Sequence, residues 1–141
     1  MELTVNYLAI LIASIVSMVI GFLWYAPFLF GNIWAKLKGY TPESFKEAQK
    51  GMGKYFALNA VLMVLMAYVL AHVIGLSEAF YGYTALKSGF CSALFAWLGF
   101  AMPVQAMMTI YGDKKWNLFA IDSGYQLASL LAMGIVLGLM G

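Results

Sequence analysis

The chain of 141 residues is 64% hydrophobic and only 10% charged, with a mean hydropathy of +0.86. Soluble domains carry roughly 25% charged residues, so the composition excludes an ordinary soluble globular domain. All eight basic residues are lysines, which argues against a nucleic-acid or phosphate-binding protein built on arginine forks. Cys91 is the only cysteine, which excludes an intrachain disulfide.

Four stretches nearly free of charge divide the chain, at residues 3–35, 55–77, 88–112 and 116–141. Each is longer than the roughly 20 apolar residues that a membrane helix needs. The sequence therefore predicts an all-α polytopic membrane protein, with one domain over residues 1–141 that forms a four-helix transmembrane bundle. The predicted helices span about 5–30, 55–75, 88–111 and 117–140.

The lysines gather on alternate sides of this predicted bundle. The loop at 36–54 holds five lysines, the loop after the second helix holds only Lys87, and the third loop holds Lys114 and Lys115. By the positive-inside rule, the first and third loops face the cytoplasm and both termini lie outside. We therefore expect an N-out/C-out topology, with the first helix retained because Glu2 and the absence of an early lysine do not fit a cleaved signal.

The cytoplasmic loop at 36–54 has the pattern of a short amphipathic helix. Thr41, Pro42 and Glu43 are typical of an N-cap, a first helical proline and an acidic first turn, and Gly51 is suited to end the helix. Such a helix either lies on the membrane surface with its lysines near anionic lipid, or is a solvated loop helix.

Asp122 is the strongest candidate for a functional residue, because an ionisable group within a membrane helix is costly. Asp122, Tyr125, Gln126 and Ser129 recur at helical spacing and form a polar stripe on the fourth helix. The stripe indicates a proton, cation or ligand-head site. Alternatively, at roughly 7 Å from the start of the helix, Asp122 caps the helix and hydrogen-bonds its neighbours.

Other polar and aromatic residues are predicted at the depth of Asp122, in the cytoplasmic half of the bundle. If they meet there, they form a polar cavity. Each amide taken alone is also explained as interhelical hydrogen bonding, worth about 1 kcal/mol or less. The predicted ligand-binding residues are Asp122, Tyr125, Gln126, Asn59, Gln105, Trp24 and Tyr25.

Metal and nucleophile chemistry has few candidates in this chain. His72 is the only histidine and lies near the opposite membrane face from Asp122, and Cys91 is its only possible thiol partner. Zinc and haem sites need more ligands, so we expect no metal and no cofactor. Pro27 and Pro103 are expected to kink the first and third helices.

Small residues at four-residue spacing form ridges that allow close helix packing. Contacts within the chain and a homo-oligomer explain these ridges equally well. The ridges comprise Ala9, Ala13, Ser17 and Gly21; Ala67, Ala71 and Gly75; and Gly134 and Gly138.

Three segments carry a family resemblance. The first runs from Gly21 through Trp24-Tyr25-Ala26-Pro27 to Leu29-Phe30-Gly31 and Trp34; the others are Trp97–Phe100 with Pro103, and Ile121–Tyr125 with Met133-Gly134 and Leu137-Gly138. Together they resemble the bacterial membrane-protein family catalogued as domain of unknown function 1761, over nearly the whole chain. The resemblance implies four helices in a bacterial inner membrane and no established activity. It also implies that the position of Asp122 can carry asparagine, which favours hydrogen bonding there over strict proton transfer.

These patterns favour an oligomeric binding or transport protein for a small or lipid-like ligand held in the polar cavity. The alternative is a structural or assembly partner of other membrane proteins, and a membrane enzyme comes last because no nucleophile–base pair is visible. Expected partners are the lipid bilayer, further copies of the chain through the small-residue helix faces, and anionic lipid at the cytoplasmic loop, with no nucleic acid.

Overall fold

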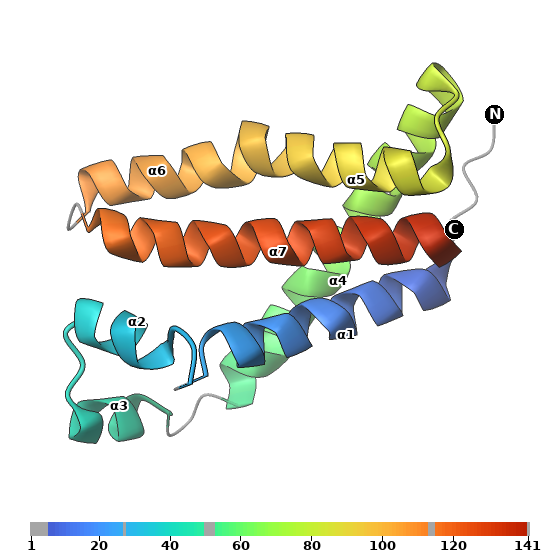
Figure 1. Ribbon diagram of the computed structural model, residues 1–141. Helices are drawn as coiled ribbons and strands as arrows, with labels where there is room; N and C mark the ends of the chain where they lie inside the picture. Colours follow the sequence, from blue (N-terminus) through green and yellow to red (C-terminus); the bar gives the residue numbers. More distant parts are fainter. Residues whose placement is uncertain (1–5, 27, 50–52, 113–114, 141) are drawn as a thin grey trace.

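The computed structural model describes residues 6–26, 28–49, 53–112 and 115–140, and its regular elements are all helical (Figure 1). Four helical segments of this part of the chain are long and apolar enough to cross a membrane: α1, α4, the continuous α5–η1–α6 segment, and α7. The predicted all-α fold with four membrane helices is thereby confirmed. The elements are α1 (Tyr7–Trp24), α2 (Gly31–Leu37), α3 (Pro42–Gln49), α4 (Gly53–Tyr81), α5 (Ala85–Ala96), the π-helix η1 (Trp97–Ala101), α6 (Met102–Tyr111) and α7 (Trp116–Met140).

Helix α7 is the central helix, with α1 on one side, α5 and α6 on the other, and α4 crossing behind it (Figure 1). Its side chain Met133 is fully buried, and small residues of the neighbouring helices, Ala13, Ala67 and Ala93, are buried beside it. The first and last described residues, Asn6 and Met140, lie at the same end of the bundle, where the Asn6 amide donates to the Met140 carbonyl at 2.9 Å. The cytoplasmic or external placement of that end stays a prediction.

The closest helix contact joins α5 to α7 through glycines. A Cβ added to Gly89 would lie 2.1 Å from the Gly134 carbonyl oxygen, and one added to Gly134 would lie 2.3 Å from the Gly89 oxygen. Gly138 faces the Ala85 carbonyl in the same way, at 2.7 Å. The Gly134–Gly138 ridge therefore packs inside one chain, and any contact between copies would use other surfaces.

The predicted start of α3 agrees with the structure. The ends of the first and second membrane helices differ from the prediction. Thr41 caps α3 as predicted, because its hydroxyl accepts from the Ser44 N–H at 3.1 Å. Helix α4 continues to Tyr81 and ends before Gly82, whose φ of +68° favours glycine. The predicted helix end at Gly51 lies outside the described residues.

The first membrane helix ends at Trp24 and not at residue 30. The chain turns back there, with the Phe30 N–H donating to the Trp24 carbonyl at 3.1 Å, and α2 then begins. Gly31 makes this turn possible, since a Cβ there would lie 2.2 Å from the Tyr25 carbonyl oxygen. The apolar composition continues through the turn, which is why hydropathy alone extends the helix. The predicted kink at Pro27 lies outside the described residues.

Helix α4 diverges from the α5–η1–α6 segment. A turn over residues 82–84 joins α4 to α5, and the two helices stay in contact near it. Farther along, α6 follows α7 while α4 crosses behind α7 towards α1 (Figure 1). The resulting wedge between α4 and α6 contains the hollow described below.

Candidate functional site

The seven residues predicted to bind a ligand do not share one cavity. The structure brings Trp24, Tyr25, Asp122 and Tyr125 together where α1 and α2 meet α7, and it places Gln105 and Gln126 on the opposite side of α7, beside α6. Asn59 is half-buried on α4 and contributes to neither group.

The first group is the Asp122 cluster, formed by Trp24, Tyr25, Trp34, Asp122 and Tyr125. The Tyr25 hydroxyl donates to Asp122 Oδ1 at 2.6 Å, and the Tyr25 ring makes edge-on contacts with the rings of Trp34 and Tyr125 at 5.7 and 5.4 Å. Trp24 Nε1 donates to the Ile121 carbonyl at 3.0 Å. These side-chain contacts hold the turn after α1, and the α2 helix that follows it in sequence, against α7.

Glycines bring these rings against the helices. A Cβ on Gly21 would lie 2.9 Å from the Tyr125 hydroxyl, and one on Gly124 would lie 3.1 Å from the Trp24 ring. The Tyr125 hydroxyl also reaches the Ser17 carbonyl at 3.4 Å. Because the rings pack this closely, the geometry supports the interpretation of Asp122 as an interfacial aspartate that hydrogen-bonds its neighbours.

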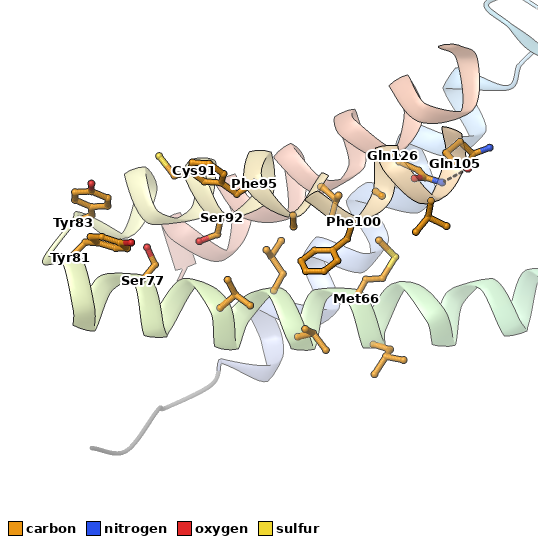
Figure 2. Close-up of a pocket in the computed structure, with 18 of the residues that line it drawn as sticks. Met66, Ser77, Tyr81, Tyr83, Cys91, Ser92, Phe95, Phe100, Gln105 and Gln126 are labelled. Atoms are coloured by element: carbon orange, nitrogen blue, oxygen red, sulfur yellow. Dashed lines mark hydrogen bonds between the residues drawn. The ribbon is translucent and has the colours of Figure 1, made fainter. Parts of the chain in front are cut away.

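The second group lies in the α4–α6 groove, a hollow of about 1010 Å³ that is almost entirely apolar. Its walls converge towards the α4–α5 turn and separate towards α6 (Figure 2). Its lining residues are Leu65, Met66, Val69, Leu70, Val73, Ser77 and Tyr81 of α4; Tyr83; Cys91, Ser92, Phe95 and Ala96 of α5; Phe100 and Ala101 of η1; Val104, Gln105 and Met108 of α6; and Gln126 and Leu130 of α7.

A glutamine pair lies at the wide end of the groove (Figure 2). Gln126 Nε2 donates to Gln105 Oε1 at 3.2 Å. A primary amide carries two N–H donors and one carbonyl acceptor. This single bond therefore leaves the Gln105 amino group and the Gln126 carbonyl able to bond a ligand.

The polar stripe predicted on α7 is divided between two neighbours because of helix geometry. Successive residues point about 100° apart around an α-helix, so Tyr125 and Gln126 face different sides. Tyr125 reaches Ser17 of α1, whereas Gln126 reaches Gln105 of α6. Shared depth in the membrane is thus insufficient to place residues in one site.

The π-helix η1 keeps the groove face continuous along the third span. Groove residues on α5 are followed after a step of five by groove residues on η1: Phe95 by Phe100, and Ala96 by Ala101. In an α-helix a step of five turns a side chain by about 140° away from its starting face, whereas a π-helix pairs residues i and i+5. Gln105 therefore faces the same groove as Phe95.

Trp97 begins this π-turn, and Pro103 follows it. Trp97 Nε1 donates to the Ser123 carbonyl at 2.9 Å, which supplies the partner that an indole N–H needs. Pro103 is the second residue of α6, where its missing N–H and its ring would disturb a regular α-helical turn. The expected irregularity at Pro103 takes the form of a π-turn in a continuous helical segment.

Aromatic residues close the narrow end of the groove. The rings of Tyr81 and Tyr83 stack with centroids 5.2 Å apart and planes 13° apart, and Lys87 Nζ lies 4.0 Å from the centroid of the Tyr83 ring. Ser92 and the partly exposed Cys91 line the groove beside them (Figure 2). The groove thus has an aromatic end and an amide end.

His72 lies apart from both groups of residues. Its Nδ1 is 2.9 Å from the Tyr68 carbonyl oxygen, one turn earlier on α4. No three His, Cys, Asp or Glu side chains gather around a possible metal position in the described ranges. The serines, tyrosines, glutamines and Cys91 that line the groove offer hydrogen bonds, and the rest of its lining offers apolar contact.

The chain belongs to the family described as Protein of unknown function (DUF1761), whose model matches residues 8–138. This match confirms the resemblance seen in the sequence. Comparison with curated proteins and with solved structures found no match.

Proposed function

We propose that this DUF1761 protein, as a multi-pass membrane protein, binds a lipid-like amphipathic molecule in the α4–α6 groove. The observation that carries the proposal is the glutamine pair, Gln105 and Gln126, at the wide end of a mostly apolar groove. Ligand sites are typically apolar hollows with a few polar groups that fix orientation. The groove volume of about 1010 Å³ lies at the upper end of the usual range of about 300–1000 Å³.

The position of the groove supports entry from the bilayer. Phe95 and Phe100 line it and are 70% and 76% exposed, respectively, so the groove is open along its side. In a membrane this side faces lipid tails. An amphipathic molecule could therefore move in laterally without crossing the polar surface of the protein.

The predicted topology orients the groove relative to the two faces of the membrane. With both termini outside, the wide end lies in the cytoplasmic half of an inner membrane, and lysines of the first loop such as Lys36 and Lys38 lie near anionic headgroups. Binding of the polar head in that half is the role we propose, in place of the polar cavity around Asp122. The runner-up, a docking protein for other membrane proteins, requires a helix of the partner to occupy the same groove.

Native mass spectrometry of the full chain released from lipid nanodiscs tests the proposal. Val69 lines the groove and is 52% exposed, whereas Val61 lies on the same helix outside the groove and is 64% exposed. The wild type and Val61→Trp should retain a small amphipathic molecule, and Val69→Trp should lose it because the indole fills the groove.

Two results would count against ligand binding. Equal retention by Val61→Trp and Val69→Trp would place the bound molecule elsewhere on the surface. A wild-type protein that carries no small molecule and co-purifies with another membrane protein, lost on Val69→Trp substitution, would favour the docking function.

A further inference from the structure

Resting on the proposed function, we infer that the ligand is a neutral single-chain amphiphile, with about 16 carbons in its chain and a hydroxyl or primary amide as its head. Three features of the α4–α6 groove carry this inference: the charge of its lining, the unused atoms of its glutamine pair, and its length.

The lining favours a neutral head. None of the described residues that line the groove is charged. A charged group in an apolar membrane site is strongly disfavoured unless an opposite charge compensates it. Lys87 lies at the far end on the ring of Tyr83 and is not a lining residue. A carboxylate-headed ligand would have to turn its head towards Lys87, away from the glutamines.

The glutamine pair favours a head that both donates and accepts. The Gln105 amino group is free to donate and the Gln126 carbonyl is free to accept, because their mutual bond uses only Gln126 Nε2 and Gln105 Oε1. A hydroxyl or a primary amide satisfies both atoms at once. An ester or ether only accepts, and it would leave the Gln126 carbonyl without a partner.

The length of the groove sets the chain length. Gln105 and Cys91 line its two ends and are fourteen residues apart, which is about 21 Å at about 1.5 Å per residue. An extended hydrocarbon advances about 1.25 Å per bond, given carbon–carbon bonds near 1.5 Å and angles near 111°. About 16 carbons therefore fit before the stacked rings of Tyr81 and Tyr83.

The narrow end favours one chain over two. Helices α4 and α5 are joined by a turn of only three residues, 82–84, and stay in contact beside it. Packed helices are separated by about 8–10 Å between their axes, and side chains occupy most of that distance. A single hydrocarbon chain can lie between the converging walls, whereas a second chain would have to remain outside the groove.

The only cysteine of the chain supplies a direct assay for chain position. Cys91 lines the narrow end, so a bound tail should slow its alkylation by N-ethylmaleimide in nanodiscs. The probes share a sixteen-carbon chain and differ in the head: hexadecanol, hexadecanamide, hexadecyl sulfate and hexadecyltrimethylammonium. Dodecanol and icosanol test the length.

Hexadecanol and hexadecanamide should slow the alkylation of Cys91 at least about fivefold, and the two charged probes should leave it nearly unchanged. Gln105→Leu should raise the hexadecanol concentration for half-protection about tenfold, because it removes one hydrogen-bond donor. The shorter and longer alcohols should protect less than hexadecanol. Leu94→Cys with Cys91→Ser is the control, because Leu94 lies on α5 outside the groove and should be alkylated at one rate throughout.

The outcomes separate the two proposals. If no probe of any head slows the alkylation of Cys91, the proposed lipid-like binding function itself fails. If the charged probes protect as well as the alcohol, or Gln105→Leu leaves the hexadecanol midpoint unchanged, binding stands and the neutral-head inference is overturned. Alkylation that is slow without probe and speeds up on protein dilution would indicate a second copy in the groove, and would also overturn the inference.

Discussion

Removing the Tyr25 hydroxyl tests whether the Asp122 cluster is structural or ligand-binding. Tyr25→Phe deletes the 2.6 Å hydrogen bond to Asp122 and keeps the ring that packs on Trp34 and Tyr125. A hydrogen bond to a charged group contributes about 1.5–3 kcal/mol. Because Tyr25 and Asp122 are only partly buried, we expect a loss near the lower end, about 2 kcal/mol in the free energy of unfolding.

The assay is unfolding by sodium dodecyl sulfate in mixed micelles, arranged as a double-mutant cycle. Asp122→Asn keeps an oxygen that accepts from Tyr25, so alone it should cost only about 1 kcal/mol. In the Tyr25→Phe background the same change should cost nothing, since an unpaired neutral amide is easier to hold in a membrane than an unpaired carboxylate. Tyr111→Phe is the matched control, because this ring is 88% exposed and its hydroxyl should contribute little.

Ligand retention in the same variants decides between the two roles of Asp122. The α4–α6 groove does not include Tyr25 or Asp122, so both single variants should retain the bound amphiphile at the wild-type level. A Tyr25→Phe protein of wild-type stability that has lost its ligand would refute this reasoning and would restore Asp122 as a binding residue.

Two further predictions concern the helices that shape the groove. Gly134→Ala should destabilise the protein by about 1–3 kcal/mol in the same unfolding assay, because its Cβ would meet the Gly89 carbonyl at 2.3 Å. Gly99→Ala, where a Cβ meets no atom within 4 Å, should be neutral, and equal effects of the two changes would contradict the packing. Trp97→Phe should remove the bond to the Ser123 carbonyl and increase hydrogen exchange at η1; unchanged protection there would show that other contacts hold the π-turn.

The membrane spans could be predicted from the sequence because lipid requires a continuous apolar segment in which every backbone group is bonded within the helix. A helix start could also be predicted where the two hydrogen-bonding residues are close in the sequence, as in the cap of α3 by Thr41. The end of α1 was not predictable in this way. The turn there depends on a backbone contact between Gly31 and Tyr25, while the composition stays apolar beyond it.

The arrangement of the candidate site residues could be predicted only in part, because depth along a helix is easier to infer than direction around it. Gln105 and Gln126 were correctly paired by depth, yet the same criterion also grouped them with Trp24 and Tyr25 on the far side of α7. The π-turn inserts one extra residue into the helical repeat of the third span. The hydropathy pattern does not reveal this insertion. Pro103 was its only local signal, and a proline by itself also fits an ordinary kink.

The contrast between Asp122 and the glutamine pair explains why we place the proposed ligand site at the glutamines. The cost of burying Asp122 draws attention to it, but its carboxylate is already bonded by Tyr25 within a tightly packed cluster. Gln105 and Gln126 cost less to bury, and they combine unused donors and acceptors with an adjacent apolar volume. The polar head of a ligand gains hydrogen bonds only from atoms that are free to bond it. We therefore base the proposed function on the neutral amides rather than on the charged residue.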